Sequence, residues 1–175
     1  MARSVENSRI VIVGAGNLAT CLGLALKRVG VVPQAVWSRS EASASSLADK
    51  LGCPCTTDID SLPAADIVIA AVSDDALPAV AARLVAKYSD ALLVHTAGSV
   101  PMAIWADAGA RRYGVFYPMQ TFSKAKEVDF SRLGIFVESA AECDCFVLEA
   151  LAGRLTTIPK RLKSTSFALL NVCIG

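Results

Sequence analysis

Short apolar runs alternate along the chain with longer segments in which apolar residues recur every three or four positions. Continuous apolar runs are typical of strands buried on both faces of a sheet, and the longer period is typical of helices packed against it. The alternation predicts an α/β fold with a doubly wound, mostly parallel sheet. The expected strands are residues 9–13, 31–37, 53–56, 65–72, 91–95, 112–117, 134–138 and 154–158, and the expected helices are 17–29, 41–51 and three that end near residues 88, 108 and 152.

Three of these helices follow side chains that can cap a helix. Ser73 or Asp74 can accept a hydrogen bond from a free backbone N–H at the start of the third helix, and Ser99 has the same position before the fourth. Ser139 and Glu142 have the spacing of a capping box, in which each side chain bonds the backbone N–H of the other residue. These signals predict where the three helices begin.

The first expected strand runs directly into residues 14–19, which read G-x-G-x-x-A. Gly14 permits a tight turn, the missing side chain of Gly16 lets backbone come close to a pyrophosphate, and Ala19 lets the next helix pack on the sheet. That helix also presents free N–H groups and the positive end of its dipole to an anion. The turn predicts the phosphate site of a dinucleotide in a Rossmann fold. The alternative is a glycine turn in another α/β protein.

The second expected strand ends at Trp37 and is followed by Ser38, Arg39 and Ser40, where a Rossmann unit faces the adenosine ribose. Sites that prefer NAD place an acidic side chain here, and this stretch has none. A guanidinium and two hydroxyls suit a 2′-phosphate, to which arginine forms forked, charge-assisted hydrogen bonds. We therefore expect NADP rather than NAD. The alternative is a solvent-exposed arginine that caps a turn.

Polar residues follow the fourth and fifth expected strands, whose carboxyl ends should border the same crevice as the glycine turn. Val72, Ser73 and Asp74 follow the fourth strand, and helix capping explains the last two as well as a ligand does. His95, the only histidine, ends the fifth strand, where it could donate to a ligand or move a proton. The alternative is a histidine satisfied by the surrounding backbone.

Composition excludes some partners without changing the fold class. A net charge of +1 gives no electrostatic reason to expect nucleic acid or an anionic membrane as the main partner. The sequence has no signal-peptide pattern and no apolar stretch near the roughly 20 residues of a membrane span. We therefore expect a cytoplasmic protein.

Six cysteines include two Cys-x-Cys pairs, so disulfides or a metal site are alternatives to weigh. Structural zinc sites space the thiols of a pair by two or more residues, and His95 is far from both pairs in the sequence. No metal ligand is therefore expected, and the cysteines are interpreted as small apolar fillers. They are Cys21, Cys53, Cys55, Cys143, Cys145 and Cys173.

With these segments in place, the chain resembles a family of Rossmann-like proteins that carry a second, helical domain. The family is related to pyrroline-5-carboxylate reductase and to the deazaflavin-dependent NADP oxidoreductases. The later motifs are more specific than the glycine turn, although the family often has a histidine where this chain has Tyr117. The matching stretches are GAGNLA at 14–19, WSRS at 37–40, AVSDDAL at 71–77, HTAGS at 95–99 and YPMQTFS at 117–123.

The resemblance implies an NADP-dependent oxidoreductase domain that transfers hydride to or from a small-molecule substrate. It implies a pyrophosphate site, a 2′-phosphate site and a nicotinamide end with a polar wall, in which His95 and Gln120 are the catalytic candidates. The implied pyrophosphate residues are Gly14, Gly16, Asn17, Leu18 and Ala19, the 2′-phosphate residues are Ser38, Arg39 and Ser40, and the residues at the nicotinamide end are Val72, Ser73, Asp74 and Thr96.

Relatives in this family continue for about 100 residues with a helical domain that forms a dimer and closes the substrate site. The dinucleotide-binding domain is expected to span residues 1–158, and residues 159–175 are expected to begin the second domain. Apolar residues such as Phe167, Leu169 and Leu170 would then be uncovered, so a homo-oligomer is expected. The alternative function is a non-catalytic nucleotide-binding module that regulates or scaffolds another protein.

Overall fold

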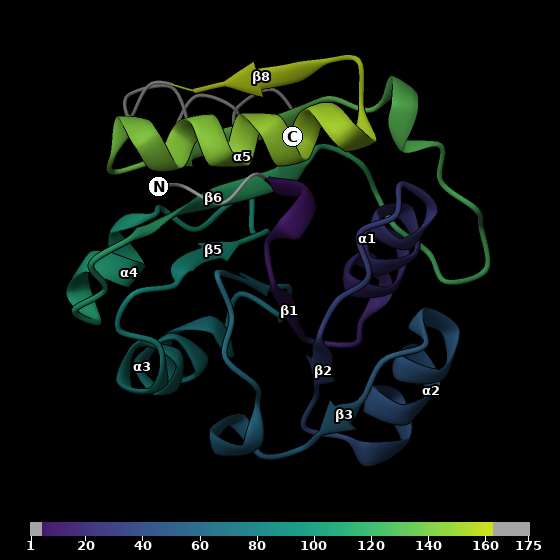
Figure 1. Cartoon of the computed structure of the whole chain (residues 1–175), viewed down its shortest axis with the longest axis horizontal. Coiled ribbons are helices and arrows are strands. Elements are labelled where there is room, and N and C mark those ends of the chain that lie inside the picture. The colour runs from purple at the N-terminus through teal and green to yellow at the C-terminus, as the bar shows by residue number, and fades with distance from the viewer. Residues whose placement is uncertain (1–4, 163–175) are drawn as a thin grey trace.

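The computed structural model describes residues 5–162, which form one eight-stranded sheet with helices on both faces (Figure 1). The strand order is β3-β2-β1-β4-β5-β6-β7-β8, and every pairing is parallel except that of β6 with β7. This order confirms the predicted doubly wound, mostly parallel α/β fold. The strands are β1 Ile10–Val13, β2 Ala35–Trp37, β3 Cys55–Thr56, β4 Ile67–Ala70, β5 Leu92–His95, β6 Tyr113–Pro118, β7 Ile135–Ser139 and β8 Pro159–Arg161.

The helices divide between the two faces of the sheet. On one face lie α1 Asn17–Arg28, α2 Glu41–Leu51 and α5 Glu142–Leu155, and on the other lie α3 Leu77–Lys87 and α4 Ala103–Asp107 (Figure 1). Three short 3-10 turns complete the described elements: Val5–Asn7, Ile59–Ser61 and Phe130–Arg132. None of the helices in the described part of the chain is long and apolar enough to cross a membrane.

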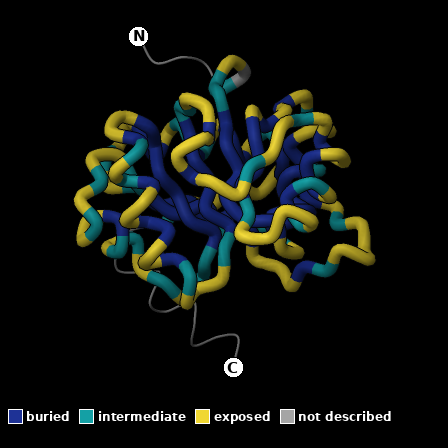
Figure 2. The backbone as a smooth tube through the Cα atoms, turned by 90° about the horizontal axis from the view of Figure 1, so that it is seen from below, coloured by how far each residue is buried: buried dark blue, intermediate teal, exposed yellow. Residues whose placement is uncertain are grey.

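The central strand β1 shows why the apolar runs are continuous. Ile10 and Ile12 pack into the core beneath α1, α2 and α5, while Val11 and Val13 pack into the core beneath α3 and α4. All four side chains are fully buried, and each buried side chain of this size stabilises the fold by about 1.5–3 kcal/mol. Figure 2 shows the buried residues in the middle of the molecule and the exposed residues around its outside.

The three predicted helix caps are wrong. The helices α3, α4 and α5 follow Ala76, Met102 and Ala141, and none of them has a side-chain hydrogen bond at its start. In each case the chain makes a turn between the polar residue and the first helical residue. A local sequence signal identifies a suitable side chain but not the backbone path that follows it.

The predicted capping residues make other contacts. The carbonyl of Ser73 accepts from the N–H of Ala76 at 3.0 Å, which closes a turn ahead of α3. Ser99 donates its hydroxyl to the carboxylate of Asp74, so this bond joins the loop after β4 to the loop after β5. The hydroxyl of Ser139 donates to a backbone carbonyl of β6 at 2.9 Å. All three residues fix loops rather than cap helices.

The predicted edge strand at 154–158 is also wrong in position. Leu151 and Leu155 are four residues apart and both buried, so α5 continues to Leu155, and the edge strand β8 begins four residues later, at Pro159. The residues expected to be uncovered lie outside the described part of the chain: Phe167, Leu169 and Leu170.

The cysteines follow the filler interpretation only in part. Cys21 and Cys145 are buried, as small apolar fillers should be, and Cys53 is half-buried. The interpretation is wrong for Cys55 and Cys143, whose side chains are exposed as free thiols. Within residues 5–162 no group of three or more metal-ligating side chains comes together.

Candidate functional site

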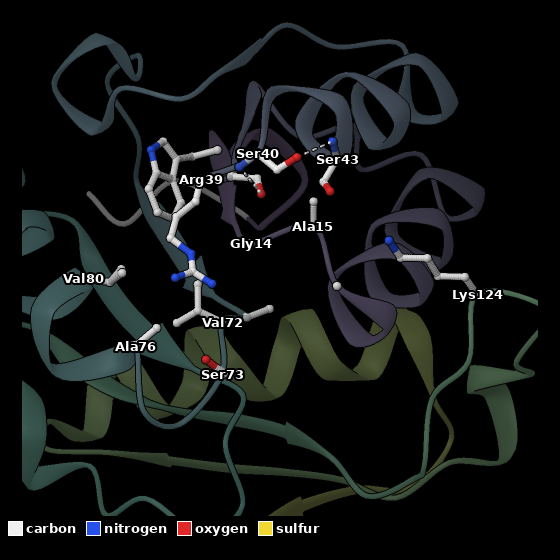
Figure 3. A pocket seen from close by; sticks show the side chains of 14 residues that line it. Gly14, Ala15, Arg39, Ser40, Ser43, Val72, Ser73, Ala76, Val80 and Lys124 are labelled. Carbon is white, nitrogen blue, oxygen red and sulfur yellow. Dashed lines mark hydrogen bonds between the residues drawn. The ribbon is translucent and has the colours of Figure 1, made fainter.

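A cavity of about 620 Å³ opens at the carboxyl ends of β1, β2 and β4 (Figure 3). In a doubly wound sheet this edge is where ligands bind, because the loops that follow neighbouring strands converge there. Its walls come from the glycine turn, the end of β2, the start of α2, the loop after β4 and α3, and the loop after β6. The lining residues are Gly14, Ala15, Gly16, Trp37, Ser38, Arg39, Ser40, Ser43, Ala71, Val72, Ser73, Ala76, Val80 and Lys124.

Gly14 is a glycine that the fold itself requires. Its φ of +119° lies in the region that favours glycine, and an added Cβ would lie 2.3 Å from the carbonyl oxygen of Ala71. Its N–H donates to the carbonyl of Trp37 at 2.7 Å. These contacts hold the turn between the ends of β2 and β4, so the glycine turn has a fixed position in the cavity wall.

Gly16 differs from Gly14, because nothing in the protein requires a glycine there. Its φ is −77°, and no atom lies within 4 Å of an added Cβ. The residue is exposed and faces the cavity, so the space a side chain would fill is open to a ligand. This open cradle fits the close approach of a pyrophosphate that the motif predicts.

The first turn of α1 follows Gly16, and its free N–H groups are of the kind that bind anions. Its first N–H groups have no partner within the helix, no side chain caps the helix, and its first turn has no acidic residue. Asn17 is exposed and Leu18 is half-buried, whereas Ala19 is fully buried against the sheet. None of these three residues lines the cavity.

The end of β2 forms the second polar wall, and the first turn of α2 orders it. The Ser40 hydroxyl accepts from the N–H of Ser43 at 3.3 Å and caps α2, which leaves its own O–H proton free to donate. The Ser38 hydroxyl accepts from the N–H of Ser40 at 3.4 Å. Arg39 is exposed and pairs with no carboxylate of the described residues (Figure 3). The cap is therefore Ser40, and the guanidinium of Arg39 is available to a ligand.

The loop after β4 forms the third wall. Val72 and Ser73 line the cavity, and Ala76 and Val80 extend an apolar surface from them along the start of α3. Asp74 does not line the cavity, because its carboxylate accepts the hydroxyl of Ser99. The apolar part of this wall suits the flat face of a base or ring.

His95 lies in the core rather than in the cavity. Its side chain is fully buried and stacks against Trp105 with ring centroids 6.3 Å apart. Its Nδ1 accepts from the N–H of Ala97 at 3.2 Å, so the neutral ring carries its proton on Nε2. Burial lowers the pKa of His95 from 6.5 to about 4, against smaller opposing effects of the Pro101 carbonyl and the Asp74 carboxylate. The ring is therefore neutral at pH 7.

The other two polar residues expected at the nicotinamide end also lie outside the cavity lining. Thr96 is buried, and its N–H donates to the carbonyl of Ala70 at 3.2 Å. Gln120 is exposed in the loop after β6, and its N–H donates to the carbonyl of Pro118 at 3.0 Å. The structure thus brings together Gly14, Gly16, Ser38, Arg39, Ser40, Val72 and Ser73, and it leaves Asn17, Leu18, Ala19, Asp74, His95, Thr96 and Gln120 out of the lining.

Sequence reasoning missed several lining residues. Ser43 is at the start of α2, and Val80 lies four residues after Ala76 on α3, so helical spacing could have identified both. Lys124 had a weaker signal, because it directly follows the motif at 117–123 but comes from the far half of the sheet.

A Rossmann-type sheet with a glycine turn at its carboxyl edge defines the class of dinucleotide-binding folds. Within this class the chain belongs to the family described as NADP oxidoreductase, coenzyme F420-dependent, whose family model matches residues 9–98, about half of the chain. The match covers the glycine turn, Arg39 and the loop after β4. A comparison with curated proteins found no significant match.

Solved structures extend the similarity to nearly the whole chain. A candidate NADP oxidoreductase of Bacteroides fragilis is 40% identical, with a TM-score of 0.91 over 97% of this chain and 66% of that one. A pyrroline-5-carboxylate reductase of Coxiella burnetii is 20% identical, with a TM-score of 0.75 over 95% of this chain and 63% of that one. A pyrroline carboxylate reductase of Plasmodium falciparum with NADP bound is 13% identical, with a TM-score of 0.70 over 92% of this chain and 60% of that one.

The two reductases support the fold alone at these identities. In all three comparisons the chain spans slightly less than two thirds of the other protein's length. The similarity therefore concerns the sheet and its helices, and the rest of each of those proteins lies outside it.

Proposed function

We propose that the chain is the NADP(H)-binding domain of an oxidoreductase that transfers hydride to or from a small metabolite. The observation that carries the proposal is the cavity wall, where the open cradle at Gly16 and the guanidinium of Arg39, which pairs with no described carboxylate, face the same space. Family membership supports it, as does the description of the 40% identical Bacteroides relative as a candidate NADP oxidoreductase. When bound, NADP would supply the hydride or accept it.

Each group of residues has a defined task in this proposal. The N–H groups of residues 16–19 would donate to the pyrophosphate, with the positive end of the α1 dipole behind them. Arg39 would form charge-assisted bonds to the 2′-phosphate, and Ser38 and Ser40 would donate their hydroxyls to it. The apolar surface of Val72, Ala76 and Val80 would hold the adenine and exclude water.

The choice of NADP over NAD depends on the chemistry at the end of β2. The residues there are a free cation and two hydroxyl groups, and none of the described residues that line the cavity is acidic. An acidic side chain would favour the ribose hydroxyls of NAD and repel a 2′-phosphate. This charge distribution supports NADP.

The reaction site is proposed to lie beyond the nicotinamide end, bordered by Asp74, Thr96, His95 and Gln120. His95 is neutral at pH 7 and buried, so in its present place it would orient the loop after β5 through Ala97 rather than exchange protons with solvent. A second domain, beginning near residue 159, is proposed to complete the substrate site and to form a homo-oligomer. The strand β8, Pro159–Arg161, still pairs with β7, so the sheet extends slightly past that boundary.

A cytoplasmic location and a small-molecule substrate belong to the same proposal. The exposed thiols of Cys55 and Cys143 suit a reducing compartment. The alternative function, a nucleotide-binding module without catalysis, is favoured by one observation: the ionisable side chains on the cavity wall, Arg39 and Lys124, are cations suited to binding an anion rather than to acid–base catalysis at pH 7.

The proposal is tested by titrating the chain with NADPH and NADH. The unmodified chain is expected to bind NADPH more tightly than NADH, and Arg39→Gln is expected to weaken NADPH binding by about ten- to a hundredfold while leaving NADH within twofold. Arg111→Gln, an exposed arginine that does not line the cavity, is the matched control. Equal losses for both nucleotides in Arg39→Gln, or no nucleotide binding by the unmodified chain, would contradict the proposal.

A further inference from the structure

A second cation lies on the wall of the cavity, opposite Arg39. Lys124 comes from the loop between β6 and β7, and its side chain reaches toward the glycine turn at Ala15 (Figure 3). Arg39 and Lys124 are the only charged residues among the described lining residues. The cavity therefore has a cation on each of two sides and no carboxylate between them.

The backbone around Lys124 is fastened to α1 on both sides. The carbonyl of Ser123 accepts from the thiol of Cys21 at 3.6 Å, and the carboxylate of Glu127 pairs with Arg28 at 2.6 Å. Both partners are on α1, the helix that starts at the glycine turn. These two contacts join the loop on either side of Lys124 to α1.

Lys124 and Gly16, the residue before α1, line the same cavity. Lys124 is exposed, and no ion pair joins it to a described carboxylate. The nearby start of α1 has the positive end of the helix dipole and no acidic residue in its first turn. A bound anion between the ammonium group and the helix start would be attracted by both.

We propose that Lys124 binds the pyrophosphate of the dinucleotide from the side opposite the start of α1, an inference that rests on the proposed function. Arg39 then holds the 2′-phosphate, and the two cations have separate tasks. Arg39 selects between NADP and NAD, because only NADP has the phosphate it binds. Lys124 strengthens the binding of both nucleotides equally, because both contain the pyrophosphate.

The test compares Lys124→Gln with Lys126→Gln, a matched control two residues along the same loop. Lys126 is also exposed, and it does not line the cavity. Three probes are titrated: NADPH, NADH and adenosine 2′-monophosphate, which has the 2′-phosphate without the pyrophosphate. Lys124→Arg, which keeps the charge, and thermal unfolding of each variant complete the set.

Lys124→Gln is expected to raise the Kd of NADPH and NADH by the same factor, about three- to tenfold, and to leave adenosine 2′-monophosphate within twofold. The loss should shrink in high salt, and Lys124→Arg should bind like the unmodified chain. Lys126→Gln should bind unchanged.

Two results would overturn the inference while the proposed function stands. One is nucleotide binding by Lys124→Gln that matches the Lys126→Gln control. The other is a loss confined to NADPH and adenosine 2′-monophosphate, which would place Lys124 on the 2′-phosphate instead. If the unmodified chain binds none of the probes, both the proposed function and this inference are wrong.

Discussion

Gly14 and Gly16 are two residues apart in one turn, and the structure constrains them differently. At Gly14 an added Cβ would collide with the carbonyl oxygen of Ala71, and φ is +119°. At Gly16 an added Cβ would meet no atom within 4 Å, and φ is −77°. The fold requires the first glycine, and we expect that only the ligand requires the second.

This difference predicts opposite outcomes for the two alanine variants. Gly14→Ala is expected to lower the free energy of unfolding by more than about 2 kcal/mol, because the collision is with backbone. Gly16→Ala is expected to lower it by less than about 1 kcal/mol, the cost of a poorer N-cap, and to weaken NADPH binding by at least about tenfold. Urea unfolding and NADPH titration measure the two quantities. Unchanged NADPH binding in Gly16→Ala would refute the role given to the cradle.

His95 makes stability depend on pH. Its folded-state pKa of about 4 lies below the ordinary value of 6.5, so the unfolded chain binds a proton between these values and the folded chain does not. The free energy of unfolding therefore falls as the pH falls through this range.

Between pH 7.5 and pH 5 the unmodified chain is expected to lose about 2 kcal/mol more stability than His95→Gln, which has no group that titrates there. Urea unfolding of both proteins at several pH values measures the difference, in which the other titrating groups cancel. A difference that stays constant over this range would show that the folded protein does not hold His95 in its neutral form.

Among the elements, the first turn of α5 is joined to the sheet by an ion pair between Asp144 and Arg112. Arg112, just before β6, donates to the carboxylate of Asp144 through Nη2 at 2.5 Å and Nε at 3.1 Å. The Asp144 side chain is 2% exposed, while that of Arg112 is 43% exposed. The buried carboxylate of Asp144 therefore depends on the Arg112 guanidinium to balance its charge.

Removing one partner should cost more than removing both. Arg112→Met is expected to lower the free energy of unfolding by about 2–4 kcal/mol, because it leaves a buried carboxylate unpaired. Combining it with Asp144→Leu should recover more than half of that loss, because no buried charge remains. A thermal or urea unfolding series on the single and double variants tests this, and a double variant less stable than Arg112→Met would contradict it.

Most helices and strands could be predicted from the sequence, whereas the residues that cap the helices could not. The helix at 41–51 has the predicted bounds, and β1, β4 and β5 lie within the predicted apolar runs. Those predictions depend on burial periodicity, which is a property of many residues at once. The caps depended on single side chains, and Ser73, Ser99 and Ser139 each took part in a loop contact instead.

At the scale of the whole molecule, the sheet order decides which predicted site residues meet. The ends of β1, β2 and β4 are neighbours, so Gly14, Gly16, Arg39 and Val72 converge as predicted. The position of a residue along its strand also decides which face of the sheet its side chain points to, and for His95 that face is not the cavity. His95 is in register with Ala70, whose side chain packs into the core beneath α3 and α4, so His95 points there as well.

Lys124 could not be placed from the sequence, because its position depends on the path of a loop. Phe122 is buried next to Lys124 in this loop, and the loop contacts Cys21 and Arg28 of α1, about 100 residues earlier in the sequence. Contacts between such distant segments arise only in the folded chain.

Hydrogen exchange of the whole chain, with and without saturating NADPH, tests whether the cavity at the glycine turn binds the dinucleotide. With NADPH bound, slower exchange is expected for the backbone amides at residues 14–20, 37–44 and 71–77, which surround the cavity at the carboxyl edge of the sheet. A second cavity of about 390 Å³, lined by Arg9, Asp66, Tyr88 and Arg112 among others, lies at the opposite edge and should be unaffected. Protection confined to that second cavity, or no protection at the glycine turn, would contradict the account.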